Sequence, residues 1–421
     1  MDIFVGVIVG LLVLMILVSL HEFGHFIMAR KNDVNVLEFG IGFPPRAIAW
    51  IKDPKSGKWH RLPRSEWKKD KISKVVYSEA DDKNFAQKGM IFSLNWLPIG
   101  GFCQMDGESA ADTRKGTFGA ASFWKKTKIL LGGVTMNWLT AFIIFTILAW
   151  VGMPTFLDNQ FTVPADTRTD FTPVQVVTVA DGSPAQNAGI IPGDYIISID
   201  GNDIQYGNEI TSYNGEHAGE EVIYKIYRKG KEDCNCNTDF ETVVTLNPAE
   251  SEYLLGVTME SSQSMSYSTW SAPIVGAGLT LQLTGQTFQG IGEMLWNLIR
   301  GTGSLFSFDS NVRQEGQEAI QAVGDSVSGP VGIIGVLFPT FTSAGPANLA
   351  FLAALISVSL ACMNVLPIPA LDGGRWLLIA IYKLRRKKLT KEVEEKIVAR
   401  AFVVLLAIMI IVTILDITRF F

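Results

Sequence analysis

The chain has 421 residues, of which 48% are hydrophobic and 18% are charged, and its formal net charge is −5. This composition is too apolar for an ordinary soluble protein and too polar for a bare bundle of membrane helices, so we expect two or more structural units. No part of the charge pattern favours nucleic-acid binding.

Four apolar runs predict membrane-spanning helices. They cover Ile3 to about Met28, Ile129 to Val151, Leu349 to about Tyr382 with a break, and Ala401 to Ile417. Each approaches the length that a helix needs to cross the hydrocarbon core of a bilayer. The first run is too long and too charged at its end for a cleaved signal peptide.

Basic residues predict the orientation of these spans. Residues 30–128 carry 19 Lys and Arg against 11 Asp and Glu, and residues 383–400 carry eight basic residues. Residues 152–346 reverse the balance, with 7 basic and 23 acidic residues. Because cytoplasmic loops are rich in Lys and Arg, the two basic loops are predicted to be cytoplasmic, and the middle region and both termini are predicted to lie outside.

The first run ends in His21-Glu22-Phe23-Gly24-His25. Residues four apart share a helix face, so His21 and His25 can bind one metal ion. Glu22 is placed to take a proton from metal-bound water, which is the HExxH arrangement of a zinc hydrolase. The alternative is a structural pair of buried histidines, but two imidazoles and a carboxylate at membrane depth are costly without a function.

The first cytoplasmic loop contains apolar segments that are too short to span. Residues 41–51 predict a turn and a strand, whereas Lys52 to Lys88 is charged and irregular. Residues 93–102 include Gly100 and Gly101 and either return towards the membrane with a strand edge near the metal or form a strand of a small sheet. We consider Gly100 and Gly101 candidate substrate-binding positions.

The second span begins with Gly132, Gly133 and, four residues later, Asn137. Small residues let helices approach closely, and a lone Asn in lipid needs a partner on another helix. We expect these residues to serve helix packing, and we expect Cys103 and Cys362 to be structural.

Residues from about 171 to 260 predict a separate exported domain of short strands, with a turn, a short helix, a turn and a strand over 182–201. This string resembles a bacterial PDZ domain, in which a peptide adds as a strand to a sheet edge. Cys234 and Cys236 in a hairpin of this domain could form a tight disulfide or stay as free thiols.

Residues 272–299 read as a weak fifth span or as a helix on the membrane surface. A fifth crossing would export the basic loop 383–400 against the charge rule, so we expect a surface helix on the outer side.

The third run is interrupted by Asn364-Val365-Leu366-Pro367-Ile368-Pro369-Ala370-Leu371-Asp372-Gly373-Gly374. Irregular backbone at membrane depth is tolerated only around a polar cavity. A zinc site with two His needs a third protein ligand and an open position for water. Asp372 is the best candidate, and we expect no carboxylate in the spans to compete with it apart from Glu22.

These motifs, together with Pro98-Ile99-Gly100-Gly101-Phe102 and Ser328-Gly329-Pro330-Val331-Gly332-Ile333, follow one another as in the site-2 protease family of intramembrane zinc metalloproteases. The chain resembles its bacterial RseP-like members with a single PDZ domain. The resemblance implies one zinc ion held by His21, His25 and Asp372, with Glu22 as catalytic base. It also implies that Asn364 helps to hold the substrate strand, and the same motif makes Pro367 and Pro369 candidate substrate-binding residues.

The resemblance implies the cellular setting as well. It predicts a multi-pass protein of the bacterial cytoplasmic membrane that cleaves single-pass membrane proteins, such as an anti-sigma factor or a signal-peptide remnant, within the lipid bilayer. Two other classes remain open on the residues alone. A zinc transporter would need ligands spread across the bilayer, and a scaffold presenting a PDZ domain would leave Glu22 without a role.

The predicted fold is a polytopic α-helical membrane protein with a membrane-associated β segment and an inserted extracytoplasmic, mostly β PDZ domain. Its predicted segments are 1–30 (first span), 31–128 (cytoplasmic loop), 129–152 (second span), 171–261 (PDZ), 270–345 (surface-helix region), 346–383 (broken third span), 384–400 (basic loop) and 401–418 (fourth span).

Overall fold

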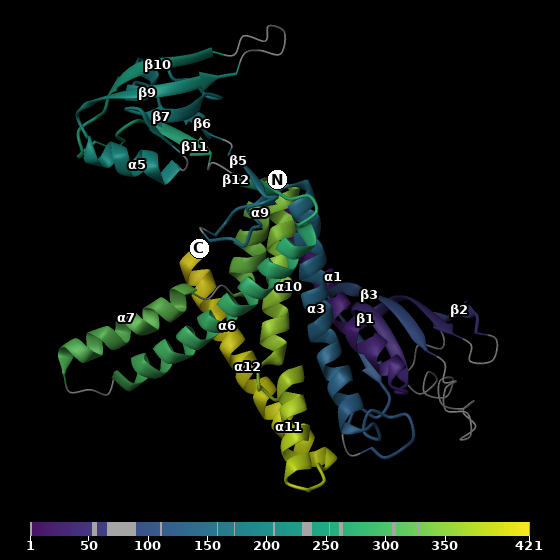
Figure 1. Ribbon diagram of the computed structural model, residues 1–421. Coiled ribbons are helices and arrows are strands. Elements are labelled where there is room, and N and C mark those ends of the chain that lie inside the picture. The colour runs from purple at the N-terminus through teal and green to yellow at the C-terminus, as the bar shows by residue number, and fades with distance from the viewer. Residues whose placement is uncertain are drawn as a thin grey trace. The chain divides into compact units, whose positions relative to one another are not determined.

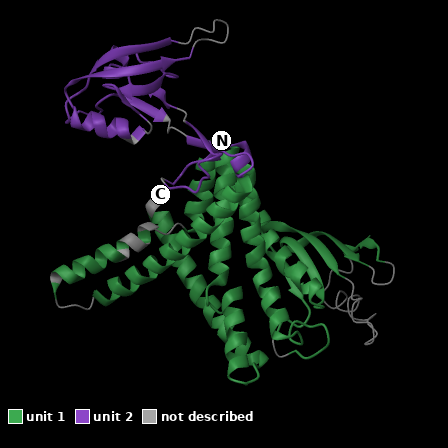
Figure 2. Cartoon of the chain, viewed as in Figure 1, with its two compact units in different colours: residues 1–148, 272–421 green, residues 149–271 purple. Residues whose placement is uncertain are grey.

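The computed structural model divides the chain into two compact units, residues 1–148 with 272–421 and residues 149–271 (Figure 2). The described residues are 2–52, 57–64, 90–109, 112–157, 159–171, 173–204, 207–229, 238–251, 253–260, 264–304, 309–326 and 329–420. Cys234, Cys236 and most of the charged stretch from Lys52 to Lys88 therefore lie outside them, and the expectations for these positions stay predictions.

Among the described residues, four helices are long and apolar enough to cross a membrane, which agrees with the four predicted spans. They are α1 (Asp2–Lys31), α3 (Phe123–Val151), α10 (Pro346–Val365) and α12 (Lys391–Phe420) (Figure 1). Apolar side chains such as Phe4, Ile143 and Ile410 are exposed on them, as expected of surfaces that face lipid.

The third span is broken where its two prolines predict. α10 ends at Val365, and α11 (Asp372–Leu384) begins at Asp372. A Cβ atom on Gly374 would lie 2.0 Å from the backbone of Ile368, so only glycine lets the turn fold back on the new helix. The break therefore sets Asp372 in the first turn of α11, where the helix dipole favours a negative charge.

A small sheet follows α1, built from β1 (Val36–Lys52), β2 (Trp59–Arg61) and β3 (Ile91–Met105) in the order β2-β1-β3. Residues 38–41 of β1 pair with both residues 91–94 and residues 101–104 of β3, because both long strands fold back on themselves. Residues 93–102 belong to the small sheet, and the same strand also packs on α1 and reaches the cavity of His21 and Glu22, so features of both alternatives are observed. Residues 101–105 pair with β1 on one side, and no described strand pairs with their other side.

The remaining helices of this unit follow the second unit in sequence. α6 (Ala272–Ser304) and α7 (Ser310–Ser326) pack together as neighbours and share an ion pair between Arg300 and Glu315. α6 is not among the four candidate spans found in the described residues, and its place on the membrane surface stays a prediction. A shorter apolar segment of α8 (Pro330–Gly332), η3 (Ile333–Leu337) and α9 (Phe338–Ser343) packs on α1 through Gly6 and Gly10.

The second unit is mostly β structure around its own apolar core. Its larger sheet has the order β10-β9-β7-β6-β11, with β8 paired to β7, and its smaller sheet has the order β4-β12-β5. The strands are β4 (Met153–Pro154), β5 (Arg168–Phe171), β6 (Val174–Val179), β7 (Tyr195–Ile199), β8 (Asn202–Asp203), β9 (Glu221–Arg228), β10 (Thr238–Thr245), β11 (Val257–Glu260) and β12 (Ser264–Tyr267). The two helices are α4 (Pro184–Asn187) and α5 (Gly207–Glu216). The predicted strand, short helix and strand over 174–201 correspond to β6, α4 and β7.

Candidate metal centre

Close packing of α1 against α3 creates the floor of the site. A Cβ atom on Gly24 would lie 2.2 Å from the carbonyl oxygen of Gly132, so the two backbones touch at this point. One residue further along α3, a Cβ atom on Gly133 would lie 2.6 Å from ring atoms of His21 and His25. The glycines of both helices therefore leave the two imidazoles just enough room beside α3.

Three potential metal ligands converge on this floor. The Nε2 atoms of His21 and His25 lie 3.2 Å apart, and each lies 3.1 Å from Oδ2 of Asp372. Both histidines are buried, and Asp372 is half-buried. His21 and His25 come from α1, and Asp372 comes from the first turn of α11.

The chemistry of these three atoms fits a metal ion. Ligand atoms bound at about 2.0–2.1 Å to a tetrahedral zinc ion would lie about 3.3 Å from one another, close to the separations found here. A carboxylate oxygen and the ring nitrogens that bind metal are all lone-pair donors, and Oδ2 of Asp372 is buried without a hydrogen-bond partner. A cation bound between the three atoms would accept their lone pairs and remove the repulsion between them. Two His with one Asp suit zinc.

The other nitrogen of each imidazole has its own partner. Nδ1 of His25 lies 2.8 Å from the carbonyl oxygen of Ile129, to which it can donate, leaving Nε2 for metal. Nδ1 of His21 lies 3.1 Å from Nδ2 of Asn137, whose Oδ1 is buried without a partner. Turning the Asn137 amide by 180° places Oδ1 where it accepts the Nδ1 proton of a metal-binding His21.

Asn137 thus does more than the helix packing expected from the sequence. The predicted interhelical partner exists, but it is a candidate metal ligand. The only sequence signal for this role was a polar side chain in an apolar span, which does not by itself say which helix it meets.

Glu22 lies in the same cavity without belonging to the ligand set. A cavity of about 260 Å³ is lined by His21, Glu22, His25, Asn364 and Asp372, among others. The backbone of Cys103 in β3 hydrogen-bonds Glu22. Asn364, at the end of α10, faces this cavity while its amide nitrogen donates to the Leu360 carbonyl 3.0 Å away.

The other residues singled out from the sequence are two glycines, two prolines and two cysteines, and not all of them line the cavity of the candidate ligands. Gly100 and Gly101 pack on α1, because Cβ atoms there would meet Val18 at 3.1 Å and Ser19 at 2.9 Å. Pro369 lines a second cavity that also includes Asp372, whereas Pro367 is exposed and lines neither cavity. Cys103 and Cys362 are buried free thiols.

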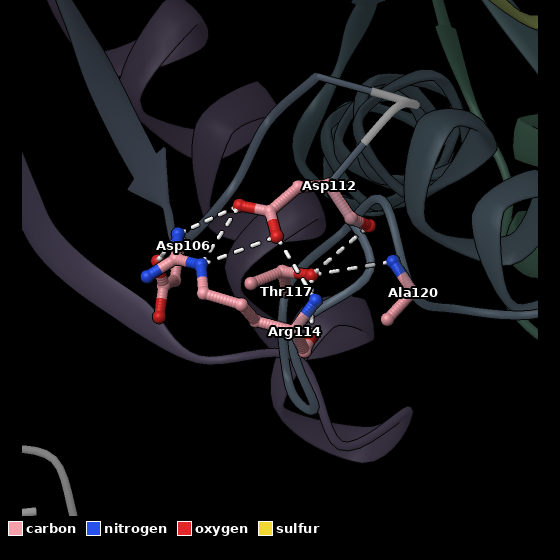
Figure 3. Close-up of polar contacts among 5 residues, drawn as sticks. All are labelled: Asp106, Asp112, Arg114, Thr117 and Ala120. Carbon is pink, nitrogen blue, oxygen red and sulfur yellow. Dashed lines mark hydrogen bonds and ion pairs between the residues drawn. The ribbon is translucent and has the colours of Figure 1, made fainter.

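A larger polar cavity of about 740 Å³ adjoins the site, sharing Glu108, Leu371, Asp372 and Arg375 with it. Part of its wall is the loop between β3 and α3, shown in Figure 3. Arg114 joins Asp112 at 2.6 Å and Asp106 at 3.3 Å, and the Thr117 hydroxyl donates to the Arg114 carbonyl at 2.7 Å (Figure 3). These contacts tie the loop together at a wall of the cavity that Asp372 also lines.

Asp416 is a further carboxylate of the spans, but it does not compete with Asp372 for a metal ion. It lies in α12 and is buried, so Glu22 is not the only other carboxylate in the spanning helices. It accepts hydrogen bonds from the backbone N–H groups of Gly329 and Gly332 and belongs to no metal-ligand cluster among the described residues. Asp372 therefore stays the candidate ligand.

Comparison with known proteins gives the family. The model of peptidase family M50 matches residues 9–58 and 83–409. The chain is 26% identical over 411 residues to a zinc metalloprotease of Clostridium perfringens, covering 98% of each chain. It is 27% identical over 471 residues to one of Staphylococcus aureus, covering all of both chains, and 24% identical over 451 residues to the zinc metalloprotease RasP of Shouchella clausii, covering 96% of this chain and 97% of that one. With four candidate membrane spans among the described residues and a convergent set of candidate metal ligands, the chain belongs to peptidase family M50, the site-2 protease family of membrane zinc metalloproteases.

Proposed function

We propose that this protein hydrolyses peptide bonds within the transmembrane segments of other membrane proteins. The observation that carries the proposal is the convergence of His21, His25 and Asp372 beside Glu22, in a cavity next to an unpaired strand edge. Of the alternatives, a zinc transporter is disfavoured because the described residues contain a single cluster of metal-ligating side chains.

His21, His25 and Asp372 would hold one zinc ion, which when bound acidifies water and polarises a carbonyl group. Glu22 is the proposed base. It accepts the proton of the attacking water and then delivers it to the leaving amine. Its position next to His21 but outside the ligand set leaves its carboxylate unbound by the metal and available for this proton transfer.

The strand edge explains how a helical substrate could be opened. In an antiparallel pair, alternate residues direct their backbone groups to the same side, and Cys103 directs its backbone towards Glu22. Gly101 is two residues away on the same strand, so its backbone groups face the same side. A substrate segment that pairs here replaces its lost helical hydrogen bonds with new ones, and Asn364 would contact it from α10.

We place the protein in the bacterial cytoplasmic membrane, with both termini and residues 171–261 outside. The asymmetry of basic residues supports this orientation. The substrates would be single-pass membrane proteins of the anti-sigma-factor or signal-peptide-remnant type, cut here after a first extracytoplasmic cleavage in a regulated intramembrane pathway.

Residues 171–261 are proposed to be a PDZ domain. In support, β11 is an end strand of the larger sheet, and a cavity of about 460 Å³ is lined both by its residues 257–259 and by Thr211 and Asn214 of α5. A groove between a helix and a sheet edge suits a peptide that adds as a strand.

Replacing Glu22 by Gln tests the proposal. We expect cleavage of a model transmembrane peptide in detergent to fall to background, while zinc content stays near that of the wild type, because Gln keeps the shape but loses the basicity. His21→Ala is the matched control, which should lose zinc as well as activity. Cleavage by the Glu22→Gln variant at a rate close to the wild type would exclude Glu22 as the base.

A further inference from the structure

A further cavity, separate from the two beside the candidate metal ligands, lies on the far side of α1. It measures about 500 Å³, within the range of ligand-binding pockets. Every described residue of its wall is apolar or aromatic: Phe23, Phe26, Phe39, Trp50, Trp59, Met90 and Phe92. We call it the aromatic pocket.

The aromatic pocket is not a subsite for the residues that flank the scissile bond. On a helix with 3.6 residues per turn, Phe23 and Phe26 point roughly 150° away from the mean direction of His21 and His25. Phe23, Phe26 and Phe39 pack against one another with ring centroids 5.6–5.9 Å apart, so they form one continuous aromatic wall of the pocket. A substrate strand beside Glu22 would lie on the other side of this aromatic wall.

The pocket is open to its surroundings. Phe23 is 39% exposed and Trp59 is 46% exposed, although both line an entirely apolar cavity. Exposed apolar surfaces of this kind mark sites for membrane or ligand contact. Phe23 lies two turns before the end of the candidate spanning helix α1, on the side of the chain that leads into the basic loop.

Positive charges share the face of the sheet that carries the pocket. In the β1–β2 pair, Lys52 lies opposite Trp59, and Arg61 lies opposite Trp50. Residues directly opposite each other in an antiparallel pair put their side chains on one face, so Lys52 and Arg61 stand on the face of the two tryptophans. Both are exposed, and neither forms a side-chain ion pair within the described residues.

The described residues of this region carry charge of one sign only. Residues 52 and 57–64 contain four basic side chains, Lys52, Lys58, Arg61 and Arg64, and no acidic one. An apolar pocket beside such a cluster matches a ligand with a long apolar body and an anionic head.

We propose that the aromatic pocket binds an acyl chain of an anionic phospholipid, whose phosphate contacts Lys52 and Arg61. The lipid belongs to the leaflet that faces the basic loops. Bound there, it fills the space between α1 and the sheet and ties the β1–β2 hairpin to the membrane surface. The proposal does not depend on which bond the protease cuts.

Native mass spectrometry of the purified full-length protein tests the site. Phosphatidylglycerol and phosphatidylcholine are added separately to the wild type, to Lys52→Glu/Arg61→Glu and to Trp59→Ala. Each Lys or Arg near an anionic membrane contributes a factor of about five in affinity, so the double reversal should reduce bound phosphatidylglycerol by at least about 25-fold. Trp59→Ala should weaken the binding of both lipids, because it removes part of the pocket wall.

His60→Glu is the control. It adds one negative charge next to Trp59, but alternation along β2 puts His60 on the opposite face from Trp59 and Arg61. It should keep phosphatidylglycerol binding within about twofold of the wild type if the contact is local rather than a general surface attraction. A loss in His60→Glu equal to that in the double variant, or unchanged binding in Trp59→Ala, would overturn the proposal. Zinc content near that of the wild type shows that each variant is folded.

A photo-reactive residue at position 59 separates a lipid from other occupants. Crosslinking in membranes should attach an acyl chain to this position. Crosslinking to a substrate peptide instead would assign the pocket to substrate and refute the lipid site.

Discussion

Two aspartates, buried Asp416 of the spanning helix α12 and half-buried Asp372 of α11, have opposite surroundings. Asp416 of α12 accepts hydrogen bonds from Gly329 and Gly332, at 3.1 and 2.9 Å, so each of its oxygens has a donor. Asp372 of α11 has an oxygen whose near neighbours are the ring nitrogens of His21 and His25. Burial of a carboxylate at membrane depth thus does not identify a site. Its partners do, because backbone donors satisfy a structural carboxylate and converging lone pairs require a cation.

Replacing Asp372 should have the largest effect. We expect Asp372→Asn to lose most of its zinc and to cleave at background rates, because an amide is a poor substitute for a charged ligand. Zinc is measured by elemental analysis of the purified protein. Asp416→Asn is the matched control and should keep its zinc. If instead Asp416→Asn lost zinc and Asp372→Asn kept it, the assignment of the two aspartates would be reversed.

Asp416→Ala should reduce stability without removing the metal. It leaves two buried N–H groups without an acceptor, at about 1–3 kcal/mol each, so the free energy of unfolding should fall by about 2–6 kcal/mol. Thermal denaturation in detergent measures the loss. Asp416→Asn keeps one acceptor oxygen and should lose less, and equal losses in the two variants would show that the hydrogen bonds are not the cause.

Asn137→Ala should weaken zinc binding by about 10–100-fold, the usual effect of removing the partner that orients a metal-binding His. Competition with a chelator measures the affinity. Asn137→Asp keeps an acceptor for Nδ1 of His21 and should retain more affinity than the Ala variant. If Asn137→Ala bound zinc with the affinity of the wild type, helix packing would be the only role left for Asn137.

Ser357→Ala should give the smallest effect. The Ser357 hydroxyl donates to the backbone carbonyl of Asn137 at 2.9 Å. This hydrogen bond lies next to the site but involves no candidate metal ligand. We expect a stability loss of about 0.5–1.5 kcal/mol and an unchanged zinc affinity. A change in zinc affinity comparable to that of Asn137→Ala would mean that the position of α10 controls the site.

The sequence predicts the spans and the break in the third one because length, apolarity and proline act locally. It also predicts β6, α4 and β7, whose turn residues and alternation are local signals. His21 and His25 could be paired from their spacing alone, whereas Asp372 needed the argument that a third ligand must exist. Asn137 and Asp416 could not be assigned, since each depends on which helix lies opposite, and that is set by packing over long sequence distances.

The contact between Gly24 and Gly132 makes the two middle positions of the motif unequal. The pattern HExxH allows any residue at both middle positions. A library of variants with random residues at positions 23 and 24 would sample the two positions equally. In this protein there is no space for a side chain at position 24, since even one methyl group would meet the backbone of α3. Position 23 lies on the other side of the helix, where Phe23 packs on Phe26 and Phe39 but stays 39% exposed. Selection for function from such a library should therefore return almost only glycine at position 24 and a broad set of apolar residues at position 23. Position 24 is thus the constrained one of the two.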